Sequence, residues 1–247
     1  MRLFARMLVS SFVVLVAAPA MAQQGQWTIT PYAWLAGFNG SLGTEGTPPG
    51  LNGGRIDVDT SGTHLSQIGA MLHLNWRQGP WSAFGDWTYA NVKADSPTPF
   101  ATLYAGTDVK VRGNIVEANV GYDLLGARDS HVDLFGGVRF YDMHIDLALR
   151  QGTLPGASVG GNSQWADGVV GVRAVTRFAG NWQAFASADV GGGGSDLAWQ
   201  LYGGVGYQFS WGSLIAGYRH LHVNYVKNSY KLDGALTGPL IGASFYF

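Results

Sequence analysis

Apolar and polar side chains alternate along short segments of the chain, from residue 26 to its end. In the clearest segment, residues 182–190, positions two apart share one face of the chain. One face carries Trp182, Ala184, Ala186, Ala188 and Val190, and the other carries Gln183, Phe185, Ser187 and Asp189. A period of two is typical of a β-strand with two unlike faces, and helical periodicity is absent. The pattern predicts an all-β protein.

Turn-forming residues divide the chain into ten such segments. They are residues 26–42, 65–77, 81–94, 107–123, 131–148, 163–179, 181–191, 195–209, 212–227 and 231–247. The connections alternate between tight turns, such as Gln78-Gly79 and Gly180-Asn181, and longer loops, such as residues 43–64. Short turns at one end and longer loops at the other are typical of outer-membrane barrels. We expect a closed antiparallel transmembrane β-barrel of about ten strands. Eight or twelve strands remain open, because residues 43–64 could hold another hairpin or a short plug.

The composition supports a membrane barrel over a soluble one. Charged residues make up 13% of the chain, against roughly 25% in soluble domains. No segment after the N-terminal region offers the roughly 18 consecutive apolar residues of a membrane-spanning helix. A barrel strand explains both facts, because it turns only every second residue to the lipid. Net charge is −1, so no broad basic surface points to nucleic acid, and the chain has no Cys.

The first residues have the pattern of an export signal. Arg2 and Arg6 precede an apolar run at residues 7–18, and Ala20-Met21-Ala22 fits a cleavage site. The run is short for a spanning helix, so an uncleaved anchor is the weaker alternative. We expect residues 1–22 to be a cleaved signal peptide and residues 23–247 to be the barrel, located in the bacterial outer membrane.

Aromatic residues cluster where the predicted strands meet the short turns. They are Trp27, Trp76, Trp81, Trp182, Phe209 and Trp211. Amphipathic rings prefer the depth of the lipid head groups, so these residues are expected to form an aromatic girdle.

Charged residues on the strand faces opposite the apolar ones are expected to line the lumen. The predicted lumen charge network is Asp86, Glu117, Arg139, Asp167, Arg173, Asp189 and Arg219. Asp86, Glu117 and Arg173 are expected at one depth, with the remaining arginines and Asp189 slightly farther from the short turns. Both signs are represented almost equally, which favours internal ion pairs over a pore selective for one ion sign. We expect a polar lumen mostly filled by side chains, at best a narrow or gated pore.

The last strand, residues 238–247, alternates and ends in Phe. It resembles the C-terminal signal of outer-membrane barrels, with Phe245 and Phe247 as the residues read by the assembly machinery. Across nearly all of residues 23–247 the chain resembles a proteobacterial family of outer-membrane barrels, and more distantly it is similar to small outer-membrane barrels and porin-like proteins. The stretches that carry the resemblance are WSAFGDWTYANV (81–92), VEANVGYDL (116–124), DLFGGVRFYD (133–142), WADGVVGVRA (165–174), DVGGGGSDLAWQLYGGVGYQF (189–209) and AGYRHL (216–221). The resemblance implies location and fold, and it assigns no substrate.

Three other patterns contain residue types that can carry chemistry. Asp142, His144 and Asp146 share a face near the far rim, where omptin-like proteases carry acid–His couples, but no omptin motif is recognisable. His220 and His222 share another face; they offer two metal ligands where zinc normally needs three or four. Residues 191–194 match no phosphate or calcium loop and are expected to form a hairpin. We predict no catalytic residues, no metal and no cofactor.

The sequence therefore favours a structural or narrow porin-like barrel. Its expected partners are outer-membrane lipid and the barrel assembly machinery. Any transported cargo is expected to be small solutes or ions. A hydrolase acting on lipid or peptide at the outer leaflet is one alternative. Adhesion or recognition through the extracellular loops is another.

Overall fold

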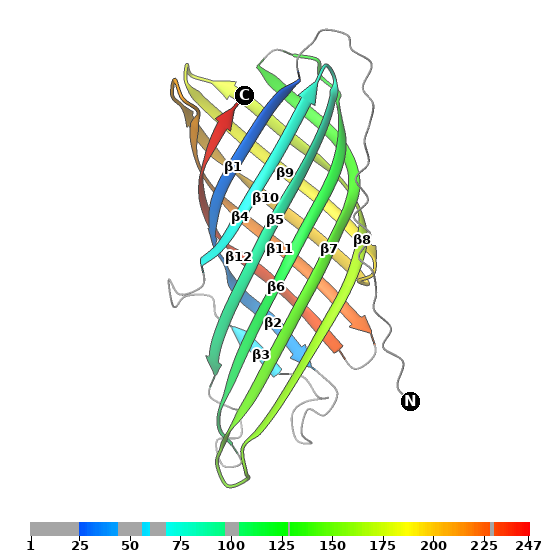
Figure 1. Ribbon diagram of the computed structural model, residues 1–247, viewed down its shortest axis with the longest axis vertical. Helices are drawn as coiled ribbons and strands as arrows, with labels where there is room; N and C mark the ends of the chain where they lie inside the picture. Colours follow the sequence, from blue (N-terminus) through cyan, green and yellow to red (C-terminus); the bar gives the residue numbers. More distant parts are fainter. Residues whose placement is uncertain (1–24, 44–55, 60–67, 97–103, 128, 228–229) are drawn as a thin grey trace, which may run out of the picture.

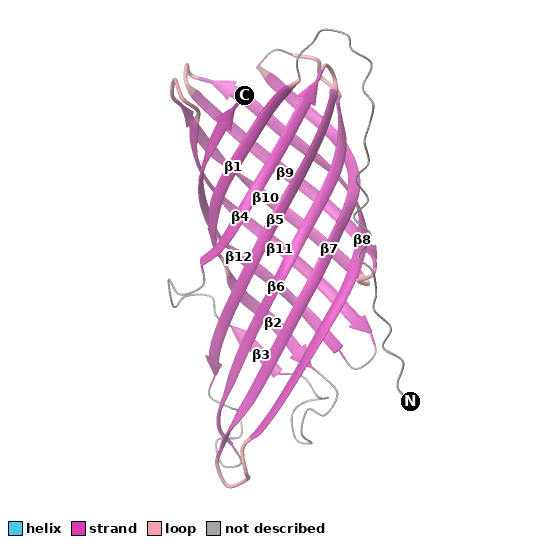
Figure 2. Cartoon of the chain, in the orientation of Figure 1, coloured by secondary structure: helices cyan, strands magenta, loops and turns pink. Residues whose placement is uncertain are grey.

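The computed structural model describes residues 25–43, 56–59, 68–96, 104–127, 129–227 and 230–247. All its regular elements are strands, drawn in Figure 2. They are β1 (Gln26–Leu35), β2 (Gly37–Gly43), β3 (Ile56–Asp59), β4 (Ile68–Gln78), β5 (Trp81–Ser96), β6 (Tyr104–Asp123), β7 (Ser130–Gln151), β8 (Ala157–Phe178), β9 (Trp182–Gly193), β10 (Leu197–Gln208), β11 (Ser213–Lys227) and β12 (Tyr230–Tyr246). Within these residues, no helix is long and apolar enough to cross a membrane.

The strands form one antiparallel sheet that closes on itself (Figure 1). Each strand from β4 to β12 pairs with the next, and β12 pairs with β1 to complete the ring. β1 and β2 follow one another along the same edge of β12, so together they serve as one barrel strand. The result is the predicted closed barrel of ten strands.

Among the described residues one further element occurs, β3, in the segment 43–64, which was expected to be a loop with another hairpin or a short plug as alternatives; its antiparallel pairing with β2 fits the hairpin. Its four residues pair with β2, from Asn39↔Asp59 to Leu42↔Ile56. β3 therefore extends the barrel wall beside β2, beyond the start of β4. The predicted signal peptide lies outside the described residues.

The two ends of the barrel differ. The connections after β4, β6, β8 and β10 are short and lie at the end where β12 finishes, which we call the short-turn end (Figure 1). Gly79 and Gly180 have φ angles of 56° and 75° in two of these turns, a region that favours glycine. At the opposite, far end, β7 and β8 have 22 residues each, whereas β9 and β10 have 12. One side of the wall therefore extends well beyond the other, and residues 149–162, which lie between two of the predicted strands, are mostly strand.

The outer surface is apolar along a band next to the short-turn end. On β7, Leu134, Val138 and Phe140 are exposed, whereas their neighbours Asp133, Phe135 and Arg139 are buried. Exposed outward residues on other strands include Val116, Val120, Val170, Val172, Leu201, Val205, Leu214 and Ile241. Apolar residues outside and charges inside reverse the soluble arrangement and suit a wall surrounded by lipid.

Candidate lumen site

The deepest charges in the lumen centre on Arg139 of β7. Its side chain is fully buried and donates to Glu117 Oε1 and Asp189 Oδ1, both at 2.7 Å. Glu117 lies directly opposite Arg139 in the β6–β7 ladder, whereas Asp189 comes from β9, across β8. Buried charges require such pairing, because an unpaired ion costs several kcal/mol away from water.

Arg219 of β11 forms a second centre beside the first. Its guanidinium donates to Gln200 Oε1 at 2.8 Å through Nε and to the Tyr32 hydroxyl at 2.6 Å through Nη1. Its Nη1 lies 3.3 Å from Asp86 Oδ1, and its Nη2 lies 3.6 Å from Glu117 Oε1. The Arg139 and Arg219 centres therefore share the carboxylate of Glu117. The Tyr32 hydroxyl in turn donates to Asp86 at 2.8 Å. Strands from opposite sides of the barrel thus meet in one network.

A third cluster lies closer to the short-turn end. Asp133 accepts from Arg77 at 2.5 Å and from Arg173 at 2.7 Å, and Arg173 also donates to Asn75 at 3.0 Å. The Arg173 guanidinium stacks over the Phe84 ring at 4.0 Å from its centroid. Arg173 was expected at the depth of Asp86 and Glu117, and this grouping is wrong: its partner is Asp133. Strand tilt explains the error. The expected depths are counts of residues from each short turn, and such counts ignore the tilt of the strands relative to the barrel axis.

Asp167 has a different role from the other predicted lumen charges. It is buried, but its carboxylate accepts from the backbone N–H groups of Gly194 and Ser195 and from the Ser195 hydroxyl, at 2.9, 2.7 and 2.6 Å. It therefore holds the turn between β9 and β10, and no described residue forms a salt bridge with it. The glycine-rich segment 191–194 is part of a hairpin, as expected, with Asp167 as its support.

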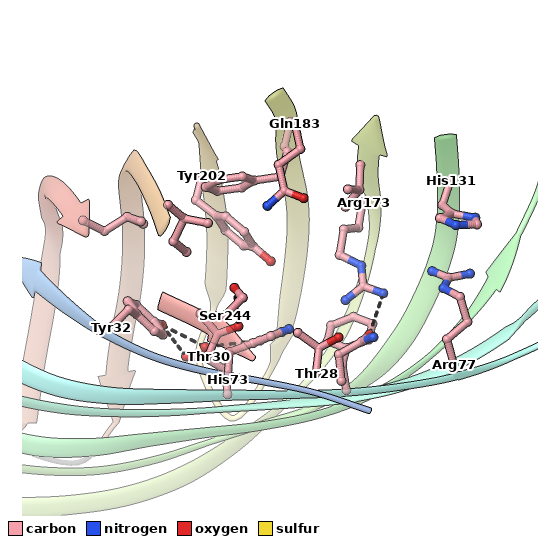
Figure 3. Close-up of a pocket in the computed structure, with 18 of the residues that line it drawn as sticks. Thr28, Thr30, Tyr32, His73, Arg77, His131, Arg173, Gln183, Tyr202 and Ser244 are labelled. Atoms are coloured by element: carbon pink, nitrogen blue, oxygen red, sulfur yellow. Dashed lines mark hydrogen bonds and ion pairs between the residues drawn. The ribbon is translucent and has the colours of Figure 1, made fainter. Parts of the chain in front are cut away.

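The short-turn half of the lumen contains a cavity of about 380 Å3, which we call the vestibule. Figure 3 shows Thr28, Thr30, Tyr32 and Ser244 on one side of it and Tyr202 and Gln183 on the other. Its floor is the Arg219 network, and its rim at the short-turn end includes Gln26, Arg77, Asp129, His131, Arg177 and Tyr246. Its volume lies in the range of small-molecule pockets, roughly 300–1,000 Å3. The sequence did not reveal Arg77, Tyr32 or Gln200 as parts of this site.

Beyond the network the lumen changes character, and the expectation of a polar lumen is wrong for this half. The buried interior residues there are apolar, and we call them the plug: Trp34, Phe38, Val111, Ile115, Tyr141, Met143, Ile145, Leu149, Trp165, Leu221, Val223, Tyr225, Leu232 and Leu236. Trp165 stacks between Tyr141 and Tyr225, with ring centroids 4.6 and 4.1 Å apart. The plug encloses a cavity of about 20 Å3, room for about one water molecule. The lumen is therefore filled here.

The other candidate residues lie on the outside of the wall. His144 contacts Asp146 at 3.0 Å on the water-facing surface of β7, and Arg112 also pairs with Asp146. His220 forms a hydrogen bond with the Thr237 hydroxyl at 2.7 Å, and its ring lies tilted against Trp199 with the centroids 4.5 Å apart. Among the described residues no cluster of three or more metal-ligating side chains occurs.

The predicted girdle residues Trp27, Trp81, Trp182, Phe209 and Trp211 are exposed on the outer surface at the short-turn end, and the half-buried Trp76 faces Trp27 across the β1–β4 ladder. Aromatic contacts run around this edge: Phe209 stacks on Trp211 at 5.6 Å, and Trp211 lies 5.6 Å from Phe245. The terminal Phe247 exchanges two backbone hydrogen bonds with Trp27, at 2.9 and 3.0 Å. The C-terminal residue thus completes the ring of strands.

Comparison with known proteins adds evidence on the fold. No family model matches the chain, and no curated protein matches it. The outer membrane protease OmpT from Escherichia coli superposes with a TM-score of 0.53 at 11% sequence identity, over 94% of this chain and 99% of that one. The translocator domain of the autotransporter NalP from Neisseria meningitidis gives 0.48 at 13%, over 92% and 90%. Ail, the attachment invasion locus protein of Yersinia pestis, gives 0.38 at 10%, over 91% and 100%. The likeness to OmpT shows a shared barrel fold, and at this identity it assigns no activity.

Proposed function

We propose that this chain is an outer-membrane barrel with a structural role, whose lumen is sealed at rest. The observation that carries the proposal is the sequence of layers along the lumen. A solute entering the vestibule meets the network of Arg139 and Arg219, and behind it the plug. Ion pairs without water between them and a packed apolar layer both oppose the passage of ions. Conduction of small solutes or ions would require both layers to rearrange.

Conductance of refolded residues 23–247 in a planar bilayer tests the seal. With folding verified by circular dichroism, we expect no regular steps from the wild type. A double variant, Trp165→Ala with Tyr225→Ala, removes two rings of the plug and is expected to produce discrete steps. The matched control, Trp199→Ala with Tyr218→Ala, removes the same residue types from the outer surface and should stay silent. Regular steps from the wild type would contradict a sealed barrel and favour the narrow pore.

Recognition at the cell surface is a second candidate, supported by the extended side of the wall. Outward-facing charges there pair across strands, Arg112 with Asp146 at 2.9 Å and Arg150 with Asp108. This charged, cross-paired sheet offers a larger surface for a partner than the loops alone would. Replacing residues 145–161 by an Asn-Gly turn should abolish adhesion of expressing cells while the barrel still folds. Unchanged adhesion by a folded variant would remove this candidate.

We also infer that the assembly machinery and outer-membrane lipid are the partners of this chain. The C-terminal strand supplies the support, because Phe245 faces outward and Phe247 closes the ring against Trp27. Deleting Phe247 should lower the folded fraction in cells several-fold while the purified chain still refolds in detergent. Equal losses in cells and in detergent would instead indicate a purely structural role for this residue.

A further inference from the structure

The seam at which the barrel closes, between β1–β2 and β12, has two breaks in its ladder, and we call it the closing seam. Pairing runs through Thr28↔Tyr246 and Ile29↔Phe245, resumes from Tyr32↔Gly242 to Trp34↔Leu240, and resumes again at Gly37↔Thr237. The breaks fall opposite two prolines, Pro31 on β1 and Pro239 on β12.

In both prolines the backbone nitrogen, which carries no hydrogen, points into the closing seam. Pro31 keeps its pairing with Leu72 of β4, and Pro239 keeps its pairing with Tyr218 of β11. Only the pairing across the closing seam is lost on each. Proline has no N–H, so the carbonyls of Ala243 and Leu35, which face the prolines, lose their ladder donors. Both prolines are exposed on the outer surface, inside the apolar band. Unsatisfied backbone groups are costly in lipid, which makes the closing seam the weakest line in this part of the wall.

Side chains in the lumen hold the closing seam at the same two heights. The Thr30 hydroxyl donates to the Ser244 hydroxyl at 2.8 Å beside the first break. The Trp34 indole N–H donates to the carbonyl of Gly238 at 3.1 Å beside the second. Single side-chain bonds can open by rotation about χ angles, whereas a continuous ladder must separate as a unit.

The closing seam is also a wall of the vestibule. Thr28, Thr30 and Tyr32 of β1 line it beside Ser244 of β12 (Figure 3). Leu240 and Tyr246 of β12 also belong to the lining. Parting β1 from β12 would therefore connect the vestibule directly to the lipid next to the short-turn end. The rest of the lining fits a molecule with two unlike ends. Phe84, Phe185 and Ile215 offer apolar surface, while the cationic side chains Arg77 and Arg177 lie at the rim with His131 and one acid, Asp129.

We propose that the closing seam opens sideways and that the vestibule holds an acyl chain of a phospholipid from the periplasmic leaflet. The head group stays at the rim, in reach of Arg77 and Arg177, and the chain enters between Thr30 and Ser244. This proposal rests on the outer-membrane location proposed above and is independent of whether the lumen conducts.

A disulfide across the closing seam tests the proposal cleanly, because the chain contains no Cys. Thr30→Cys with Ser244→Cys locks the seam at its first break. Ser213→Cys with Ser244→Cys is the matched control, because Ser213 faces Ser244 across the uninterrupted β11–β12 ladder. The mature protein is loaded with phosphatidylglycerol in vesicles and transferred to detergent. Native mass spectrometry then follows replacement of the bound lipid by its deuterated form.

We expect one lipid retained per wild-type chain. Exchange should stop in the oxidised Thr30–Ser244 variant, return on reduction, and continue in the control. Pro31→Ala with Pro239→Ala restores two ladder donors and should slow exchange by about tenfold without a crosslink. Three outcomes overturn the proposal: no retained lipid, equal exchange in both oxidised variants, or unchanged exchange in the proline variant. Saturation by glycerophosphate with no lipid bound would instead show entry of a soluble phosphate through the rim. Channel steps in the conductance experiment would leave this result unaffected.

Discussion

The two halves of β7 show opposite arrangements of the same alternating pattern. Near the short-turn end, Val138 and Phe140 face outward and Arg139 is buried in the lumen. Beyond residue 140, Asp142 faces outward and Tyr141 and Met143 are buried inside. The strand does not shift register at this point, so the change lies in the residues and not in the backbone. The first half is built for lipid outside; the second is an ordinary water-exposed sheet with an apolar interior. We infer that the level of the change marks the edge of the membrane.

The largest expected effect comes from the lumen of the lipid-facing half. Arg139→Ala leaves Glu117 and Asp189 without their cation, and removing one partner of a buried ion pair costs about 3–5 kcal/mol. Denaturant titration in lipid vesicles should measure that loss in the free energy of unfolding. A loss below about 1 kcal/mol, the range of exposed pairs, would show that water reaches the network.

Placing arginine on the outer surface tests where lipid ends. Val138→Arg lies in the apolar band and should cost about 2–4 kcal/mol in vesicles. Ala148→Arg points outward on the same strand beyond the band and should change the free energy of unfolding by less than about 0.5 kcal/mol. Equal costs at both positions would mean that the membrane edge does not lie between them.

Removing one methyl group compares the plug with the lipid-facing surface. Ile145→Val creates a small void among packed side chains and should cost about 0.5–1.5 kcal/mol. Ile241→Val exposes the same change to lipid, which fills the space, so its effect should be close to zero. The same titration decides this prediction; a larger cost for Ile241→Val would argue against a packed plug.

The smallest effect is expected for the exposed ion pair of the extended wall. Arg150→Ala separates a surface pair with Asp108, and such pairs contribute about 0–1 kcal/mol. Raising the salt concentration should remove the difference from wild type, because salt screens exposed charges. A difference that persists at high salt would indicate packing by the arginine stem.

Strand periodicity was sufficient to predict the barrel, because one residue in two must face lipid along every strand. It was also sufficient to assign Asp86, Glu117, Arg139 and Arg219 to the inside. The apolar plug was not predicted, although the sequence contains an indication of it. Asp142 and His144 share the outward face of Phe140, and polar residues there indicate that this part of the strand does not contact lipid. Arg77 shares the parity of His73 and could have been found in the same way.

The local sequence pattern does not show which side chains pair with each other across the lumen. Arg139 and Asp189 are 50 positions apart, and Arg219 and Tyr32 are 187 apart. Which charges meet depends on the tilt of the strands and the closure of the ring, and these are properties of the whole sheet. Asp167 illustrates the limit: its position predicts burial, but only the fold shows that it holds the β9–β10 turn.

The unequal strands give the barrel a slanted rim. β7 has 22 residues and β9 has 12, a difference of about 33 Å measured along an extended strand. A large molecule that approaches from the far end meets the long β7–β8 hairpin on one side of the barrel and the shorter β9–β10 hairpin on the other. Its direction of approach is therefore restricted before any side chain is recognised.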